Sequence, residues 1–467
     1  MEAFFRVKEH GSTVRTEIVA GLTTFMAMAY ILMVNAGMFS ALEEVTYGSV
    51  YIATAISAVI GTLCIGLLAN LPLAQASGMG LNAFFVYTVC MGFGLTYANA
   101  LVLVLIDGVI FLILTATGLR KVIFDAIPAP VKAAISAGIG LFIAFLGLQN
   151  AGLVVDDGAT LVNLRSFNVL SGNATWEDLF PTVITVLTVF VIGALAKKKV
   201  KGAVMWGILG AAAVYYAMGF LTVPGFYESA VAPNLTSDFF GAFRDFAALS
   251  FGKVFTQGFD FSAYIAAHGT FDFVVMFVTT MLAFCMVDMF DTLGTLYGAC
   301  SAGNMLTEKG EVPNMNRAML SDAIATCCGA VCGTSTVTTF VESSSGVAEG
   351  GRTGLAAMST AFFFFISMFL APVAQLIPTY ACAAALVYVG VLMMSSVRDV
   401  EWSDPAVAVP AFMTMAIMPL TYNISYGIAF GLIGYIFVKL FTGKVKEINV
   451  GTWIIGALFA VMFFVSR

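Results

Sequence analysis

The sequence predicts an all-α polytopic membrane protein of about fourteen transmembrane segments, two of which are broken by short extended strands. Of its 467 residues, 60% are hydrophobic and 10% are charged, whereas a soluble domain carries roughly 25% charged residues. Apolar stretches long enough to cross a bilayer, about 20 residues each, recur along nearly the whole chain. Two of these stretches are rich in Gly, Ser and Thr, and this composition predicts an interruption in each.

The apolar stretches fall into two sets of seven. The first set is predicted near residues 16–40, 47–70, 76–94, 97–118, 130–152, 179–196 and 202–222. The second set is predicted near residues 271–300, 316–333, 336–349, 353–376, 379–397, 405–422 and 425–443. A polar loop over residues 223–270 separates the sets, and a last apolar stretch at 451–466 is expected to be a lipid-facing or interfacial helix.

An odd number of spans in each set predicts that the second set enters the membrane from the opposite side, so that the halves are inverted repeats. A faint similarity favours this arrangement, because WGILGAAAVY from Trp206 and FGLIGYIFVK from Phe430 have their glycines in step. Chance similarity between two Gly-rich apolar segments is the alternative explanation.

The distribution of charge predicts that the N-terminus lies in the cytoplasm. In this orientation most basic residues are cytoplasmic, namely Arg120, Lys121, Lys197, Lys198, Lys199, Lys201, Lys309, Arg317, Arg352, Arg398, Lys444 and Lys446. The opposite loops carry only Arg165, Arg244 and Lys253 beside many acids. Because the charges separate by side, the net charge of −6 indicates no charged partner, and no nucleic-acid footprint is visible.

The third and tenth spans carry the predicted interruptions. They read LPLAQASGMGLNAFFVYTV from Leu71 and GTSTVTTFVESSSGVAEGG from Gly333. The Thr and Val run from Thr334 to Val341 favours extended backbone, and the residues after it can begin a half-helix. Backbone of this kind is tolerated at membrane depth only inside protein or beside a water-filled cavity. Matching interruptions in inverted halves therefore predict a transport site at the midplane.

An acid at the bilayer centre costs about 2.5–3.5 kcal/mol on insertion scales, so each one needs an explanation. Asp107, Asp288, Asp291 and Glu342 are predicted at such depth, with Asp322 nearer the start of the ninth span. Glu342 is the strongest candidate ligand, because it follows an extended segment and begins a predicted half-helix, where backbone N–H groups gather. Such a carboxylate could bind a nucleobase ring, or it could simply cap its own helix.

The eighth span places Asp288, Asp291, Thr292 and Thr295 on one helical face. A polar stripe in an apolar helix is expected to face the interior of the protein. We expect the two acids to differ in role, one facing solute and the other bonding to Thr hydroxyls or to the loosened third span. For either acid alone, a purely structural hydrogen bond is the alternative.

Polar and aromatic residues flank the two interruptions. Asn82 follows the break at Gly78 and Gly80, where its amide could meet a base or stabilise the broken backbone. Phe84, Phe85 and Phe340 could stack on a planar ring. Because the chain has 42 phenylalanines, each of these is also a candidate for ordinary core packing.

The chain resembles the purine-base permeases of the AzgA type, within the nucleobase–ascorbate transporters, also called nucleobase:cation symporter 2. The resemblance covers essentially the whole chain and is carried by RTEIVAGLTTFMAMAYILMVN from Arg15, SGMGLNAFF from Ser77, VDMFDTLGTLYG from Val287 and GTSTVTTFVESSSGVAEGGRTGL from Gly333. One departure is Ala36, which stands after Val34 and Asn35 where the family commonly has proline. This departure concerns helix geometry and leaves the expected substrate class unchanged.

The resemblance implies a core domain of spans 1–4 and 8–11 and a gate domain of spans 5–7 and 12–14. On this chain the core domain would comprise residues 1–118 and 271–376, the gate domain 119–222 and 377–467, and the extracytoplasmic loop 223–270. In the family, strands of spans 3 and 10 cross near the midplane and substrate binds between them and span 8. The site implied here comprises Glu342, Asp288, Asn82, Phe84, Phe340, Val341, Ser343, Thr292 and Tyr30, with Asp291 as a structural polar residue.

The function implied by the resemblance is import of adenine, guanine, hypoxanthine or xanthine across the plasma membrane by proton symport. Glu342 and Asp288 would couple the proton, and the mechanism would be alternating access of the elevator type. We expect no cofactor and no metal, the lipid bilayer and a purine base as partners, and we leave a homodimer open. The alternatives are an anion transporter of the same fold, which the acids disfavour, and a membrane-embedded aspartyl enzyme, for which no GxGD-type sequence is present.

Overall fold

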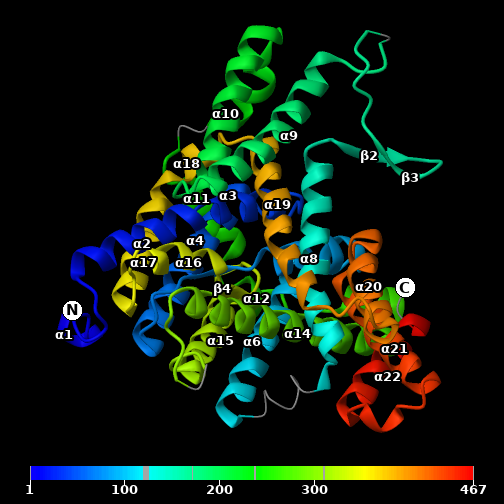
Figure 1. Cartoon of the computed structure of the whole chain (residues 1–467). Helices are drawn as coiled ribbons and strands as arrows, with labels where there is room; N and C mark the ends of the chain where they lie inside the picture. The colour runs from blue at the N-terminus through cyan, green and yellow to red at the C-terminus, as the bar shows by residue number, and fades with distance from the viewer. Residues whose placement is uncertain (1, 119–125, 171, 236–237, 309–310, 466–467) are drawn as a thin grey trace.

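A computed structural model describes residues 2–118, 126–170, 172–235, 238–308 and 311–465. Three members of the predicted cytoplasmic basic set, Arg120, Lys121 and Lys309, lie outside these ranges. Within the ranges, ten helical stretches are long and apolar enough to cross a membrane, and three shorter apolar helices accompany them. The chain is thus a mostly helical, multi-pass membrane protein, as its composition predicts (Figure 1).

The first group of elements runs from the N-terminus to residue 117. It contains α1 (Glu2–Phe5), α2 (Val14–Met28), α3 (Tyr30–Phe39), α4 (Tyr47–Cys64), β1 (Gln75–Ser77), α5 (Met79–Ala83) and α6 (Tyr97–Thr117). Ile65–Ala69 continues α4, and Phe84–Gly92 continues α5. Threonine precedes three long helices of this group, because the hydroxyls of Thr13, Thr46 and Thr96 each accept a backbone N–H of the first turn.

The next group contains α8 (Ala129–Asn150), α9 (Trp176–Lys197) and α10 (Ala203–Thr222), with a hairpin between α8 and α9. The hairpin strands, β2 (Val154–Asp157) and β3 (Leu161–Leu164), pair antiparallel and project beyond the helices (Figure 1). An all-α description is therefore incomplete. The turn is built by Asp157, whose carboxylate accepts the backbone N–H groups of Thr160 and Ala159. These hydrogen bonds, that of Thr160 foremost, lower the pKa of Asp157 to about 2.

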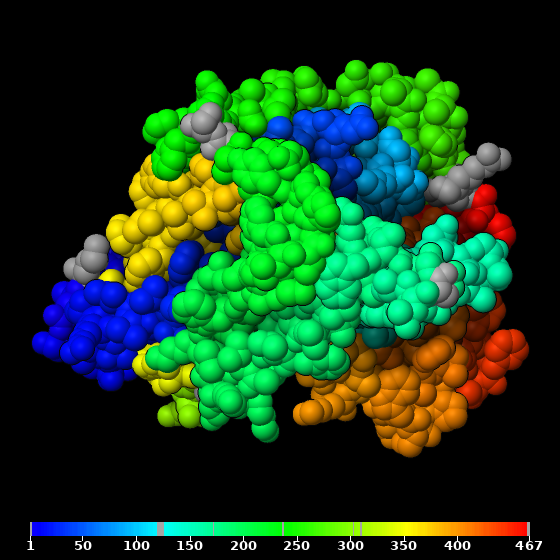
Figure 2. Space-filling view, turned by 90° about the horizontal axis from the view of Figure 1, so that it is seen from above, coloured from blue at the N-terminus to red at the C-terminus, as the bar shows by residue number. Residues whose placement is uncertain are grey.

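Residues 223–270, predicted only as a polar loop, contain a series of short helices. These are Tyr227–Val231, Ala232–Asn234, α11 (Gly241–Asp245), Phe246–Ser250, α12 (Lys253–Thr256) and α13 (Ser262–His268). Several phenylalanines of this segment are exposed, including Phe240 before α11 and Phe255 in α12. Figure 2 shows this green segment lying across the surface of the molecule. Short helices with exposed aromatic residues are typical of segments at a membrane surface.

The last group begins with the longest helix, α14. It contains α14 (Thr270–Ala302), α15 (Met315–Cys332), β4 (Val337–Thr339), α16 (Ser344–Ala348), α17 (Gly354–Ser367), α18 (Ala371–Ala374), α19 (Thr379–Met393), α20 (Pro405–Thr421), α21 (Ile424–Phe441) and α22 (Val450–Val465). Short helical turns lie at Val341–Ser343, Met368–Leu370, Met394–Asp399 and Val445–Glu447. The terminal helix α22, expected outside the repeat, packs on α21 and α14.

Strands β1 and β4 form at the two interruptions that the sequence predicts. They pair antiparallel, with Gln75 opposite Thr339 and Ser77 opposite Val337. Two further backbone bonds extend the pair, from Gly78 N to Thr336 O at 3.0 Å and from Phe340 N to Ala74 O at 3.0 Å. The two breaks therefore satisfy each other's backbone groups inside the protein, as non-helical backbone at membrane depth requires.

The helices pack in two sets. In one set α6 packs on α14 and α15, α4 packs on α15 and α17, and α2 packs on α17. In the other set α8 packs on α19 and α20, and α9 packs on α10 and α19. The β1–β4 pair lies in the first set, because β1 contacts α4 and β4 contacts α14 and α15.

Candidate functional site

A cavity of about 1540 Å³ lies between the two helix sets. From the first set its wall includes Gly78, Met79 and Gly80 at the start of α5, together with parts of α14 and the segment after β4. From the second set its wall includes the first half of α8 and the second half of α19. Its volume exceeds the usual ligand-pocket range of about 300–1,000 Å³, as expected for a space that opens to one side of the membrane.

Glu342 lines this cavity and is anchored from the opposite side by a tyrosine. It stands in the short turn Val341–Ser343, directly after β4, so the strand pair fixes its position. Tyr30, fully buried at the start of α3, donates its hydroxyl to Glu342 Oε1 at 2.6 Å. The carboxylate therefore keeps acceptor capacity for a ligand while its orientation is set by the protein.

The wall around Glu342 is mostly apolar. Val341 is 43% exposed and presents its side chain to the cavity, and Phe340 lies beside it. Ile139 and Tyr388 contribute from the second helix set. Glycine at position 80 lets α5 approach α8 closely, since a Cβ at this position would lie 2.5 Å from Ile139 Cγ2. An apolar surface with one anchored carboxylate suits a flat ring with polar edges.

The two acids of α14 separate in position. Asp291 lines the cavity, and its Oδ2 accepts the Thr338 hydroxyl at 3.2 Å. Asp288 is fully buried outside the cavity wall, and neither of its carboxylate oxygens has a hydrogen-bond partner among the described residues. The two acids therefore differ, but not in the expected way, because Asp291 both lines the cavity and bonds to a Thr hydroxyl, whereas Asp288 does neither. Asp288 as a substrate ligand stays a prediction.

A buried network behind the strand pair was not predicted from the sequence. Gln75 Nε2 donates to Asp322 Oδ1 at 3.1 Å and to Thr339 Oγ1 at 3.2 Å. The Thr292 hydroxyl donates to Asp322 Oδ2 at 2.7 Å. Asp322 is thus fully buried, in the first half of α15. The sequence feature that could have revealed this network is Gln75, an amide side chain inside an apolar segment.

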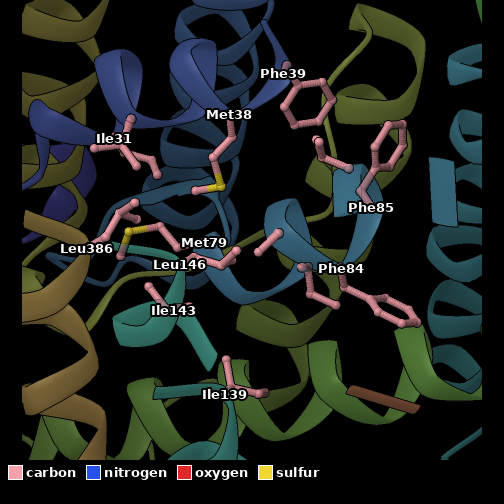
Figure 3. Packing of buried hydrophobic residues seen from close by; sticks show 14 of the residues in the cluster. Ile31, Met38, Phe39, Met79, Phe84, Phe85, Ile139, Ile143, Leu146 and Leu386 are labelled. Atoms are coloured by element: carbon pink, nitrogen blue, oxygen red, sulfur yellow. The ribbon is translucent and has the colours of Figure 1, made fainter. Parts of the chain in front are cut away.

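The remaining predicted site residues lie behind the cavity wall. Asn82 Oδ1 accepts the Ser77 hydroxyl at 2.6 Å, so in this structure the amide stabilises the end of β1. The ring of Phe84 packs 4.9 Å from that of Phe284, within the apolar core shown in Figure 3. Ser343 Oγ accepts the backbone N–H of Ala74 at 3.0 Å. Their roles, with that of Thr292, as ligands stay predictions.

Charged residues line one end of the cavity. They are Lys132, Lys199, Lys201, Glu349 and Asp399. Lys201 Nζ and Glu349 Oε2 form an ion pair at 2.6 Å, which joins the start of α10 to the chain after α16. Lys199 and Lys201 belong to the basic set predicted to be cytoplasmic, so the cavity extends from the strand pair to the lysine-bearing end of the molecule.

The sequence matches proteins of known family over nearly its whole length. A family model described as "Permease family" matches residues 15–449. A putative permease of Methanocaldococcus jannaschii is 39% identical over 99% of this chain and 98% of its own. The adenine permease AdeP of Escherichia coli is 35% identical over 98% of this chain and 95% of its own. The guanine/hypoxanthine permease PbuO of Bacillus subtilis is 37% identical over 99% of each chain.

The fold is similar to a solved transporter of distant sequence. The transmembrane domain of the cyanobacterial bicarbonate transporter BicA superposes with a TM-score of 0.61 at 14% identity, covering 88% of this chain and 97% of that chain. At this identity the likeness concerns the fold alone.

Proposed function

This chain belongs to the permease family whose model spans residues 15–449, and from this premise we propose that it carries purine nucleobases. The similarity to an adenine permease and to a guanine/hypoxanthine permease supports this substrate class. We further propose that transport is import across the plasma membrane by proton symport, with alternating access of the elevator type.

Glu342 in its cavity is the observation that carries this proposal. A purine ring presents N–H donors and nitrogen or carbonyl acceptors along its edges. The Glu342 carboxylate, held by Tyr30, can accept from the donors. The first turn of the helix that begins at Met79 leaves backbone N–H groups without helical partners, and Gly78, Met79 and Gly80 line the same cavity. Val341 and Phe340 supply apolar surface for the ring faces.

Acids at the site support coupling to protons. An ionised carboxylate is costly to move through apolar surroundings, whereas a protonated one is much less so. In the proposal Glu342, Asp291 or Asp288 takes a proton from outside and releases it inside. Neutralisation together with the bound base then allows the site to pass the opposing helix set.

The observed packing supports the proposed organisation. We propose about fourteen spans in two inverted sets, with a core domain at 1–118 and 271–376 and a gate domain at 119–222 and 377–467. The contacts of α6 with α14 and α15 and of α8 with α19 and α20 fall within these proposed domains, whereas α22 packs across the division on α14. With the lysine-bearing end placed in the cytoplasm, along with the N-terminus, the cavity around Glu342 faces inward.

An anion transporter of the same fold is the second candidate. Glu342 and Asp291 both line the cavity and would repel an anion unless protonated, so the site chemistry disfavours it.

Uptake measurements test the proposal. Right-side-out vesicles with the intact chain should accumulate labelled hypoxanthine or adenine when an inward proton gradient is imposed, and a protonophore should abolish accumulation. Glu342→Gln should lose proton-dependent accumulation, and Gln257→Ala, on an exposed turn, should keep it. If Glu342→Gln accumulates base with the proton dependence of the unaltered protein, the assignment of Glu342 is wrong. If bicarbonate or sulfate is carried and purines are not, the substrate class is wrong.

A further inference from the structure

A second cavity of about 580 Å³ lies elsewhere between the helix sets. We call it the distal pocket, and its wall includes Tyr47, Asn150, Tyr215, Gln375 and Tyr380. Its volume is within the range of small-molecule sites, about 300–1,000 Å³.

The distal pocket and the Glu342 cavity lie at opposite ends of the same helices. On α8, Ser136 lines the Glu342 cavity and Asn150 lines the distal pocket. At 1.5 Å per residue these two positions are about 21 Å apart along the axis. α19 shows the reverse order, since Tyr380 near its start lines the distal pocket and Met393 at its end lines the Glu342 cavity. The distal pocket is therefore on the side away from the lysines.

A cluster of buried apolar side chains separates the two spaces. Met38 and Leu386 line the distal pocket, whereas Met79 and Ile139 line the Glu342 cavity. Between them Ile143 is fully buried and Leu146 is 2% exposed. Figure 3 shows these side chains gathered in one cluster contributed by α3, α5, α8 and α19. The side chains of this cluster are apolar, so separating them would break no hydrogen bond or ion pair of their own.

The chemistry of the distal pocket selects against charge. No charged side chain is among its described lining residues, in contrast to the lysines and acids of the Glu342 cavity. Tyrosine and amide side chains take their place. An ion entering such a pocket would lose hydration without gaining a counter-charge, whereas a neutral polar ring would find partners.

The pocket wall is held in place before any ligand arrives. The hydroxyls of Tyr47 and Tyr216 donate to the backbone carbonyls of Ala374 and Leu376, and these bonds fix the segment before α19. The rings of Tyr215 and Tyr380 stack, with centroids 6.0 Å apart. Within the described residues the side-chain amide of Gln375 forms no hydrogen bond, so one donor and one acceptor group remain available.

From these observations we propose that the distal pocket is a second substrate site, which loads a neutral planar heterocycle from outside before it reaches Glu342. Tyr380 and Tyr215 provide the aromatic surface, and Gln375 provides paired donor and acceptor atoms for a base edge. The proposal rests on the proposed purine transport and deepens it.

Sidedness is the test, because a loading site affects only one direction. In right-side-out vesicles, Gln375→Ala and Tyr380→Ala should each raise the KM for hypoxanthine about three- to tenfold. In inside-out vesicles their KM should equal that of the unaltered protein. Gln257→Ala is the matched amide control on an exposed turn, and its KM should equal that of the unaltered protein from both sides. Glu342→Gln should impair both directions.

Cysteine labelling gives a second test, which does not require the variant to transport substrate. Thr379→Cys, placed in the pocket wall of a Cys382→Ala and Glu342→Gln protein, should react with an impermeant maleimide, and excess hypoxanthine should slow the reaction. Absence of protection, or an equal change of KM from both sides in Gln375→Ala and Tyr380→Ala, overturns the loading site. Failure of the unaltered protein to accumulate any purine would instead overturn the proposed function.

Discussion

The Tyr30 hydroxyl donates to Glu342 Oε1 at 2.6 Å, joining residues 312 positions apart in the chain. Tyr30 begins α3 and Glu342 follows β4, so this bond ties the first helices of the chain to the second interruption. It also takes one lone pair of the carboxylate and fixes the direction of the others. Site geometry therefore depends on a residue that does not itself line the cavity.

Tyr30→Phe should weaken substrate binding without unfolding the protein. The ring stays buried, but Glu342 loses a hydrogen bond to a charged group, typically about 1.5–3 kcal/mol. We expect the KM for purine uptake to rise roughly tenfold or more. Tyr51→Phe is the matched control, because Tyr51 is a buried tyrosine whose hydroxyl donates to Ser367 O at 3.0 Å instead. Equal kinetics in the two variants would contradict the role of Tyr30.

Gly80→Ala should impair transport through a contact between the helix sets. The new Cβ would lie 2.5 Å from Ile139 Cγ2, and overpacking of this kind costs about 1–3 kcal/mol. Ile139→Ala removes the clashing atom, so the double variant should recover most of the uptake rate. Uptake by the two single variants and the double variant forms a cycle, and additive losses would show that the contact does not matter.

Gln75→Leu should lower thermal stability in detergent. It removes three donated hydrogen bonds, to Ser321, Asp322 and Thr339. The buried Asp322 Oδ1 is then left with only the Thr339 hydroxyl at 3.5 Å. An unsatisfied buried acceptor costs about 1–3 kcal/mol. Gln257→Leu, on an exposed turn, should leave the melting temperature unchanged. If Gln75→Leu has the same melting temperature as the unaltered protein, the hydrogen bond from Gln75 to Asp322 does not contribute to stability.

Lys201→Glu should shift the protein away from the conformation described here. The Lys201–Glu349 pair links the two helix sets at the cavity mouth, and reversal replaces attraction by repulsion. Because the side chains are 49% and 32% exposed, the effect should be modest, up to about 1 kcal/mol, and should fade at high salt. Thiol accessibility of a cysteine placed at Ser396, in the cavity wall, measures the shift. The double variant Lys201→Glu with Glu349→Lys should restore the original thiol accessibility. If the accessibility stays shifted in the double variant, loss of this ion pair is not the cause.

Hydropathy and helix-breaking residues were sufficient to predict most of the fold. Helices form near the predicted spans because each needs only local sequence. The β2–β3 hairpin was missed because its strands are short and its turn depends on Asp157, a residue type common in ordinary loops. At the breaks, the Gly78 and Gly80 pair and the Thr run gave the position of β1 and β4, but their register depends on both halves being present.

The site was predictable as a region and less so residue by residue. Glu342 lines the cavity because it follows a break that the sequence reveals. The choice between Asp288 and Asp291 depends on the rotation of α14 about its axis, and three residues change the direction of a side chain by about 60°. Neighbouring helices set that rotation. The contributions of Ile139 and Tyr388 could not be predicted, because they come from the opposing set.

The pairing of β1 with β4 also dictates an order of events during synthesis. Gln75 and Thr339 are 264 positions apart, so the ribosome must add all of the intervening chain before β1 has its partner. At about 5–20 residues per second this takes roughly 13–50 s. During that interval the polar backbone of residues 75–77 has no stable place in lipid, and the insertion machinery or water at the membrane surface must shelter it. Folding of the first half of this permease therefore depends on the second half. It can be completed in the membrane only after the chain has been synthesised past residue 339.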